Sequence, residues 1–139
     1  MIVIDTNVLS ELMRRSPSQA VLEWVAAQPA ARLFTTTITQ AEILFGLALL
    51  PEGRRRTSLT AAASQIFAED FIDRVLPFDA VAAEAFAPIA SARRRRGRPI
   101  GAFDAQIAAI TASRGASLAT RNVMDFLDCG LTVINPWEA

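Results

Sequence analysis

The chain contains no histidine and no lysine, and these two absences exclude most of the familiar catalytic sites. Without histidine there is no Ser-His-Asp or Cys-His machinery and no imidazole ligand for a metal. Without lysine there is no Walker A phosphate loop and no Schiff-base chemistry. The single cysteine, Cys129, excludes an internal disulfide and any paired-cysteine site. What remains is the chemistry of oxygen ligands, mainly carboxylates, around a hard divalent cation.

Charge and length set further bounds. The 14 basic residues are all arginines and are balanced by 14 acidic residues, which argues against a general nucleic-acid coat. A chain of 139 residues fits one domain, so we expect a single domain over residues 1–139. No apolar run approaches the roughly 18–20 residues that span a bilayer, and the apolar start before Asp5 is too short for a signal peptide. We therefore expect a soluble, cytoplasmic protein without a membrane contact.

Short apolar segments alternate with longer helical patterns, which predicts a parallel sheet with helices on both faces, an α/β fold. In such sheets, sites form beyond the carboxyl ends of the strands. The expected strands cover residues 2–5, 33–36, 75–78, 117–120 and 131–134. The expected helices cover about 6–15, 17–28, 39–50, 52–69, 79–96 and 102–113, with a short helix capped by Asn122. Among their start signals are Thr6-Asn7, a capping box at Ser16-Pro17-Ser18-Gln19, and Thr39.

Four acidic residues occupy the positions where such a site would form. Asp5 ends the first strand, Asp125 follows the turn after the strand at 117–120, and Glu42 and Asp104 lie in the first turns of helices. Two carboxylates about 5 Å apart repel by roughly 3 kcal/mol at an effective dielectric of about 20. If the four converge, they therefore require either trapped protons or a cation, and all-oxygen ligation favours Mg²⁺ or Mn²⁺ over zinc.

Each of these acids also has an ordinary role at a helix start. Asp5 is placed to cap the first helix, and Asp104 is favoured by the helix dipole at about 0.3–1 kcal/mol. Glu42 lies three residues after Thr39, the spacing of a capping box, and Asp125 has the same relation to the preceding Asn. Position alone leaves both roles open, and one residue can serve both.

The motifs together resemble those of the PIN-domain ribonucleases, and more narrowly the FitB-like subgroup of the VapC toxins of bacterial toxin–antitoxin pairs. The matching pieces run in order along essentially the whole chain. They are Ile-Val-Ile-Asp5-Thr6-Asn7, Thr39-x-x-Glu42, Pro99-Ile100-Gly101-x-x-Asp104, Thr120-Arg121-Asn122-x-x-Asp125-Phe126 and the closing Val133-Ile134-Asn135-Pro136-Trp137.

This resemblance implies a three-layer α/β/α domain with a five-stranded parallel sheet and endoribonuclease activity that depends on Mg²⁺ or Mn²⁺. It also implies a cognate VapB-like antitoxin, a homodimer or toxin–antitoxin hetero-oligomer, and contact with DNA only through the antitoxin. Asp128 is the rival for the fourth acid, but Asp125 has the family spacing. The metal and catalytic site carries over to Asp5, Glu42, Asp104 and Asp125, with a supporting polar shell of Thr6, Asn7, Thr120 and Asn122.

Arginines cluster just before Asp104 in the sequence, and another lies beside Asn122. Single-stranded RNA needs cationic contacts along its backbone, and arginine offers a bidentate fork for phosphate. An arginine at a helix end is also explained by the helix dipole alone. The candidate contacts to RNA or a partner are Arg93, Arg94, Arg95, Arg96, Arg98 and Arg121.

Two other function classes compete with the ribonuclease hypothesis. A haloacid-dehalogenase-type phosphatase also starts from a strand-terminal Asp, but it needs a second Asp where this chain has Asn7, and it needs a lysine. Receiver domains fail on the same missing lysine. The second class is a non-catalytic α/β binding module in which the acids only cap helices.

Overall fold

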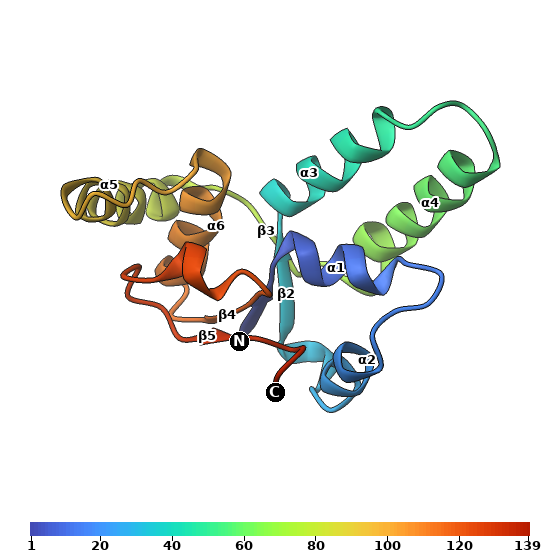
Figure 1. The fold of residues 1–139 in the computed structure, drawn as a ribbon, viewed down its shortest axis with the longest axis horizontal. Helices are drawn as coiled ribbons and strands as arrows, with labels where there is room; N and C mark the ends of the chain where they lie inside the picture. The colour runs from blue at the N-terminus through green and yellow to red at the C-terminus, as the bar shows by residue number, and fades with distance from the viewer.

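A sheet of five parallel strands runs through the centre of the computed structural model, which describes residues 1–139 (Figure 1). The strand order is β3-β2-β1-β4-β5, and every neighbouring pair is parallel. The strands are β1 (Ile2–Ile4), β2 (Leu33–Thr36), β3 (Val75–Leu76), β4 (Ser117–Ala119) and β5 (Val133–Ile134). All five lie within the segments that the sequence predicts, so the five-stranded parallel α/β fold is confirmed.

Six α-helices connect and cover these strands. They are α1 (Thr6–Leu12), α2 (Gln19–Ala26), α3 (Thr37–Ala48), α4 (Arg54–Gln65), α5 (Ala80–Arg95) and α6 (Ala102–Ser113). Shorter turns complete the chain: the 3₁₀ turns η1 (Ala30–Arg32) and η3 (Val123–Phe126), and the π-helical turn η2 (Ile66–Asp70), which continues α4. None of these helices combines the length and the apolar character needed to cross a membrane.

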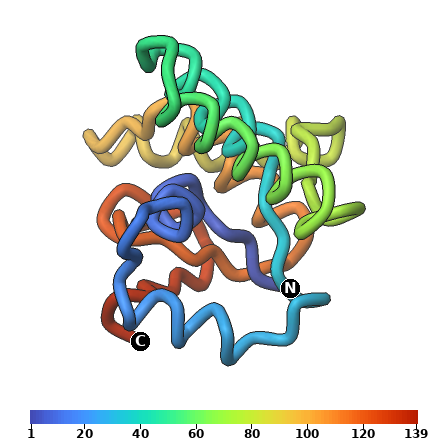
Figure 2. The backbone as a smooth tube through the Cα atoms, turned by 90° about the vertical axis from the view of Figure 1, so that its right-hand side faces the viewer, coloured from blue at the N-terminus to red at the C-terminus, as the bar shows by residue number.

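The sheet separates two buried clusters, because side chains alternate between the two faces of a strand. Val3 and Leu118 point to the side covered by α5 and α6. Ile4 and Ala119, their neighbours in sequence, point to the side covered by α1 to α4. Figure 1 shows α5 and α6 on one side and α1, α3 and α4 on the other, and Figure 2 shows α3 and α4 running side by side. The result is the three-layer α/β/α arrangement.

The starts of the first three helices test the predicted caps, and two of them differ from the prediction. α1 begins at Thr6 as predicted, and of the two predicted caps the structure has Asp5, whose side chain accepts a hydrogen bond from the Thr6 amide. α2 begins at Gln19, and its N-cap residue makes no side-chain bond, so the predicted capping box at Ser16 is wrong. α3 starts two residues before Thr39, and Thr36 caps it by accepting a bond from the Thr39 amide at 3.0 Å. The first helical residue of α2 thus lies two residues after its predicted start, and that of α3 two residues before it.

The sheet order places a site between β1 and β4. The chain leaves β1 toward β2 on one side, and later returns from β3 to β4 on the other side of β1. Ile4 is in register with Ala119, so Asp5 and Thr120 leave the sheet side by side at its carboxyl edge. Open α/β sheets bind ligands in the crevice at such a switch point, because the connections diverge there.

Candidate active site

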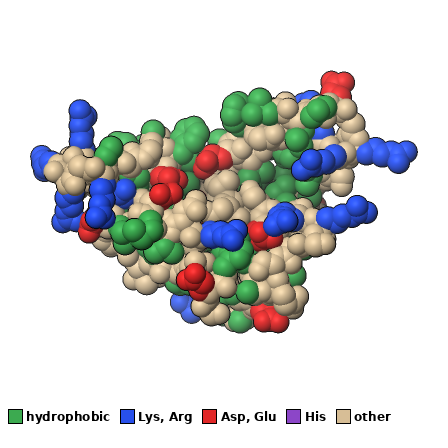
Figure 3. Space-filling view, in the orientation of Figure 1, with side chains coloured by type: hydrophobic (Ala, Val, Ile, Leu, Met, Phe, Trp, Pro, Cys, Tyr) green, Lys and Arg blue, Asp and Glu red, His purple; other side chains and the backbone are tan.

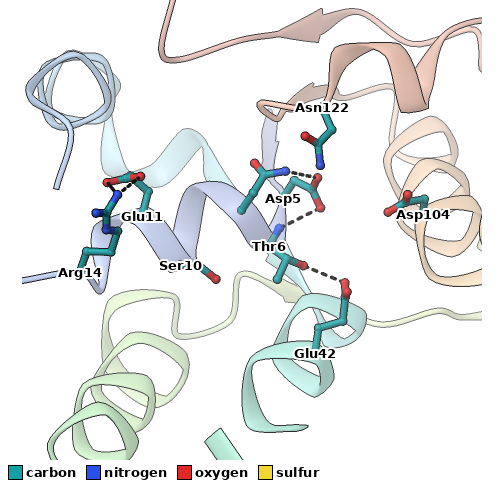
Figure 4. Close-up of a pocket in the computed structure, with 9 residues that line it drawn as sticks. Asp5, Thr6, Ser10, Glu11, Arg14, Glu42, Asp104 and Asn122 are labelled. Atoms are coloured by element: carbon teal, nitrogen blue, oxygen red, sulfur yellow. Dashed lines mark hydrogen bonds and ion pairs between the residues drawn. The ribbon is translucent and has the colours of Figure 1, made fainter. Parts of the chain in front are cut away.

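A polar pocket of about 460 Å³ opens at this edge, and none of its nine lining residues is hydrophobic. Three of the four predicted acids line it, together with three of the four predicted polar residues (Figure 4). Asp125 and Thr120 are the two predicted site residues that do not line it. The lining residues are Asp5, Thr6, Asn7, Ser10, Glu11, Arg14, Glu42, Asp104 and Asn122.

Asp5 is the most buried acid of the site, with 4% of its surface exposed. Its Oδ1 accepts a hydrogen bond from the Thr6 amide at 2.8 Å. Its Oδ2 accepts bonds from the Thr120 hydroxyl at 2.8 Å and from the Asn7 amide group at 3.2 Å. The side chain therefore caps α1 and is fixed in orientation at the same time, so both of its predicted roles are compatible with the structure.

Asn7 and Thr120 tie the end of β1 to the turn after β4. Asn7 Nδ2 lies 3.1 Å from Thr120 Oγ1, and Asn7 Oδ1 accepts a bond from the Arg121 amide at 3.0 Å. The Asn122 amide donates to Thr120 Oγ1 at 3.1 Å. Buried polar networks of this kind rigidify a site when their members are satisfied. Thr120 is thus a buried support behind Asp5.

Glu42 faces the pocket from α3. Its Oε1 accepts a hydrogen bond from the Thr6 hydroxyl at 2.8 Å, and that hydroxyl lies 3.0 Å from Thr39 Oγ1. Since Thr36 performs the capping of α3, the predicted capping box between Thr39 and Glu42 is wrong. The carboxylate of Glu42 is directed to the site instead of to the start of its own helix.

Asp104 and Asp125 approach from the other side of the sheet. Asp104 lies in the first turn of α6, where the helix dipole favours a negative charge. Asp125 lies in η3 and is exposed; Asn122 makes no side-chain capping bond there, so the predicted capping box at Asn122 is wrong. The charge of Asp125 nevertheless contributes to raising the pKa of both Asp5 and Asp104, whereas Asp128 exerts this influence on Cys129.

Burial raises the pKa of Asp5 above its ordinary value of 3.8. Hydrogen bonds from Thr120 and Thr6 oppose this shift because they stabilise the ionised form, whereas the charges of Glu42 and Asp125 add to it. Even with three hydrogen-bond donors, this carboxylate is therefore held at an energetic cost that a nearby cation would offset.

The pKa of Asp104 is also raised, and here the shift reaches the range near neutral pH. Burial, and then the charges of Asp5 and Asp125, raise the pKa of Asp104 from 3.8 to about 6, while the charge of Arg93 opposes the rise. A carboxyl group with this pKa changes its protonation state close to neutral pH. The pocket therefore gains negative charge in that range.

The candidate ligand atoms of the pocket are carboxylate, hydroxyl and amide oxygens, a donor set that suits a hard divalent cation. No three acidic or cysteine side chains are grouped closely enough to enclose a metal ion by themselves. The acids surround the pocket instead of meeting at one point. The raised pKa values of Asp5 and Asp104 and the absence of hydrophobic lining fit a cation that draws the acids together.

Arg93 is not the surface contact that the arginine cluster predicts. It is 5% exposed, and its guanidinium donates to the carbonyl oxygens of Arg98, Asp125 and Leu127 at 2.8, 2.6 and 3.0 Å. A surface contact of Arg93 with RNA or a partner is therefore wrong, because the side chain is buried and its Nε and Nη1 groups donate within the fold. Arg93 instead holds the segment that carries Asp125.

The other predicted arginines remain at the surface, and their contact with RNA or a partner stays a prediction. Basic side chains gather over the outer end of α5, away from the acidic side chains in the middle of the face shown (Figure 3). Arg94, Arg95 and Arg98 are exposed, and Arg96 pairs with Asp128 at 2.8 Å. Arg121 is exposed and lies over the Trp137 ring, 4.9 Å from its centroid.

Three residues that line the pocket were not predicted: Ser10, Glu11 and Arg14. Ser10 and Glu11 recur at helical spacing with Thr6 and Asn7 and form one polar face of α1, and Arg14 continues this spacing in the turn after the helix. The opposite face carries apolar residues such as Val8 and Leu9, both buried. The periodicity of residues 6–14 was the available signal for these positions.

Comparison with known proteins places the chain among related sequences and structures. The model of the PIN-domain family matches residues 2–126. The chain is 42% identical to the VapC ribonuclease Y4jK of Sinorhizobium fredii over 138 residues, which cover 99% of each chain. It is 35% identical to the toxin FitB of Neisseria gonorrhoeae, again over 138 residues and 99% of each chain. A chain in the solved structure of FitAB bound to an IR36 DNA fragment superposes with a TM-score of 0.92, at 35% identity, covering 99% of this chain and 96% of that one.

Replacing Arg93 by alanine should lower the free energy of unfolding by at least about 2 kcal/mol, because three main-chain carbonyl groups lose a charged donor and a buried side chain is removed. Arg94→Ala is the matched control: its side chain is exposed, so we expect a change within about 0.5 kcal/mol. Urea denaturation of both variants measures the difference. Equal stability of the two variants would show that Arg93 does not anchor the Asp125 segment.

Asp104 should make the metal-free protein less stable as pH rises. The unfolded carboxyl has the ordinary pKa of 3.8 and the folded one a pKa of about 6, so the stabilisation is complete below about pH 3.8 and is lost as pH rises through 6. The amide of the Asp104→Asn variant cannot ionise, so this variant should not lose that stabilisation. Its free energy of unfolding, relative to that of the unsubstituted chain, should rise by about 1–2 kcal/mol between pH 4 and 7, a value that is reduced to allow for the partial exposure of Asp104. Urea denaturation in EDTA at several pH values measures this. Glu138→Gln, an exposed control, should show no such trend, and a pH-independent effect of Asp104→Asn would contradict the assignment.

Proposed function

Because the chain belongs to the PIN-domain family, we propose that it is a metal-dependent endoribonuclease and the toxin of a toxin–antitoxin pair. The observation that carries this proposal is the pocket at the end of β1, where Asp5, Glu42 and Asp104 face one space without a hydrophobic neighbour. The relative named a VapC ribonuclease supports RNA as the substrate, and the relative named toxin FitB supports the toxin role. The reaction is hydrolysis of a phosphodiester bond within an RNA strand.

The cofactor that we propose is a divalent cation, specifically Mg²⁺ or Mn²⁺. When bound, such an ion lowers the pKa of coordinated water and stabilises the charge that develops on the phosphoryl oxygens. The residues assigned to hold it and to support the reaction are Asp5, Glu42, Asp104 and Asp125. Thr6, Asn7, Thr120 and Asn122 form the polar shell that orients them.

The protein's own contribution is to keep these carboxylates ready and correctly oriented. Both oxygens of Asp5 are already fixed by hydrogen bonds, and Oε1 of Glu42 is held by Thr6. Preorganised groups need little rearrangement when charge develops in the transition state. Because the pKa of Asp104 is about 6, protons compete with the cation there, and cation binding at lower pH releases a proton from that carboxyl.

A non-catalytic module is the less favoured reading. It requires the acids to serve as helix caps, and Asp5 does cap α1. Glu42 does not cap α3, and no side-chain capping bond involves Asp125. The direction of these carboxylates therefore supports a site more than a set of caps.

The partner that we propose is a VapB-like antitoxin that covers the acidic pocket, in a homodimer or a toxin–antitoxin hetero-oligomer in the cytoplasm. The similar FitAB structure is a complex bound to DNA, and we propose that DNA is contacted only through the antitoxin. Apolar side chains that are largely exposed, such as Phe45 at 64% and Leu49 at 69%, favour burial against another chain. Both lie on α3, the helix that also carries Glu42.

Asp5→Asn and Asp104→Asn should each lower the rate of RNA cleavage by at least about 100-fold, because a neutral amide cannot hold the cation as a carboxylate does. Each variant should keep the fold, as measured by circular dichroism. Asp128→Asn is the matched control, since that acid is exposed and pairs with Arg96; we expect activity within about twofold. Cleavage of a labelled RNA by purified protein measures the rates. Full activity in the Asp5→Asn/Asp104→Asn double variant would overturn the assignment.

Mg²⁺ or Mn²⁺ should raise the melting temperature in a concentration-dependent way. A ligand that binds only the folded state at 100 times its Kd contributes about 2.7 kcal/mol. The shift should be reduced most in Asp5→Asn and Asp104→Asn and retained in Asp128→Asn. Differential scanning fluorimetry at constant ionic strength measures it. No shift up to millimolar metal would favour the non-catalytic module instead.

A further inference from the structure

The pocket does not end at the acids. It continues along the polar face of α1 to Ser10 and Glu11, and then to Arg14 in the turn that follows this helix. Figure 4 shows Arg14 and Glu11 at one end of this arrangement and Asp104 at the other, with Asp5 and Thr6 between them. Arg14 is the only basic side chain among the nine that line the pocket. A site built around acids therefore has one cation, and it lies at the end farthest from Asp104.

The guanidinium of Arg14 is bound within the chain through only one of its three nitrogen atoms. Its Nη1 lies 3.3 and 3.4 Å from the two carboxylate oxygens of Glu11, while its Nε and Nη2 groups make no hydrogen bond within the chain. Its side chain is 67% exposed, and that of Glu11 is 6% exposed. Glu11 is itself fixed by the Ser18 amide, which donates to Oε2 at 3.0 Å. The guanidinium is thus anchored at one corner, and its remaining donors are free.

The spacing along α1 separates Arg14 from the acids. Arg14 follows Asp5 by nine positions, two residues past the end of α1, and at 1.5 Å per helical residue this separation is on the order of 13 Å. A phosphate held among the acids is therefore out of reach of Arg14. A neighbouring phosphate of the same strand, lying along the pocket, is the group that this guanidinium can meet.

We propose that Arg14 binds a backbone phosphate of the RNA strand away from the scissile bond, and that Glu11 aims its guanidinium into the pocket. This inference rests on the proposed ribonuclease function. An acidic pocket repels a polyanion, so a strand that crosses it needs a cation beyond the acids. Arginine binds phosphate through parallel N–H groups, and the free Nε and Nη2 edge of Arg14 offers that arrangement.

A purely structural role for Arg14 would be to neutralise the buried carboxylate of Glu11. Because Glu11 also lines the pocket, that role would place Arg14 there as well, but it leaves the Nε and Nη2 groups of Arg14 without a partner. The two roles also predict different measurements. Loss of a counterion changes stability, whereas loss of a phosphate contact changes the salt dependence of RNA binding.

The test is the binding of a fluorescein-labelled, unstructured RNA of roughly ten nucleotides, followed by anisotropy at several salt concentrations. The proteins carry Asp104→Asn, which prevents cleavage during the measurement. Adding Arg14→Ala should weaken binding about tenfold at low salt and reduce the slope of log Kd against log salt by about 0.7, the value for one phosphate contact on a single strand. Arg14→Lys keeps the charge and should recover most of the slope.

Arg15→Ala is the matched control, and it should leave both the affinity and the slope unchanged. The melting temperatures of all variants are measured in parallel. An Arg14→Ala variant with the parental affinity and slope would overturn this inference and leave the ribonuclease proposal standing. An effect of equal size in Arg15→Ala would also overturn it. No RNA binding by the unsubstituted chain at any salt concentration would overturn the ribonuclease proposal, and this inference with it.

Discussion

The burial of the Asp5 carboxylate at the edge of the sheet is the constraint on which the rest of the site depends. A charge with 4% exposure is costly unless it is hydrogen-bonded and compensated. Three donors supply the hydrogen bonds: the Thr6 amide, the Thr120 hydroxyl and the Asn7 side chain. No basic side chain of the chain pairs with Asp5, and the charges that raise its pKa are acidic. The fold thus satisfies the geometry of this group and leaves its charge uncompensated.

The sheet order explains why such a group can exist at this place. A strand end in the middle of a parallel sheet is normally covered by the connection that follows it. At β1 and β4 the connections diverge, so the Asp5 and Thr120 ends meet beside an open space. Glu42 reaches that space from α3 and Asp104 from α6, which belong to opposite layers. The two layers and the sheet edge therefore build one pocket from segments about 100 residues apart in sequence.

Much of the fold and the acidic site was predictable from the sequence, because short apolar runs and Pro or Gly punctuation mark the elements. All five strands lie within the predicted segments, and α5 begins within one residue of its predicted start, where Asp79 caps it by accepting a bond from the Ala82 amide. Asp5, Glu42 and Asp104 line one pocket as expected from their places at strand and helix ends. The sequence spacing alone does not predict that these acids meet at one site. That prediction came from the resemblance to PIN domains.

What the sequence did not predict depends on packing between distant segments. Thr36 and Thr39 are equally good caps by type, and only the path of β2 into α3 selects Thr36. Arg93 belongs to a run of four arginines that is typical of a solvated helix end. Its place at helical spacing from Ala82 and Ile89 puts it on the buried face of α5, but local sequence could not supply the carbonyl oxygens that bind it.

The arginines consequently divide into a structural and a surface set, and this division links stability to the chemistry of the site. Arg93 anchors the segment of Asp125 through main-chain carbonyls and leaves the carboxylate free. Its charge also lowers the pKa of Asp104, against the effect of burial and of the neighbouring acids. A neutral residue with the same shape would hold the segment but would let Asp104 retain its proton to higher pH. In a chain without lysine or histidine, a buried arginine is the available group that stays charged at any physiological pH, so it can both hold the loop and keep the acidic pocket ready for a cation.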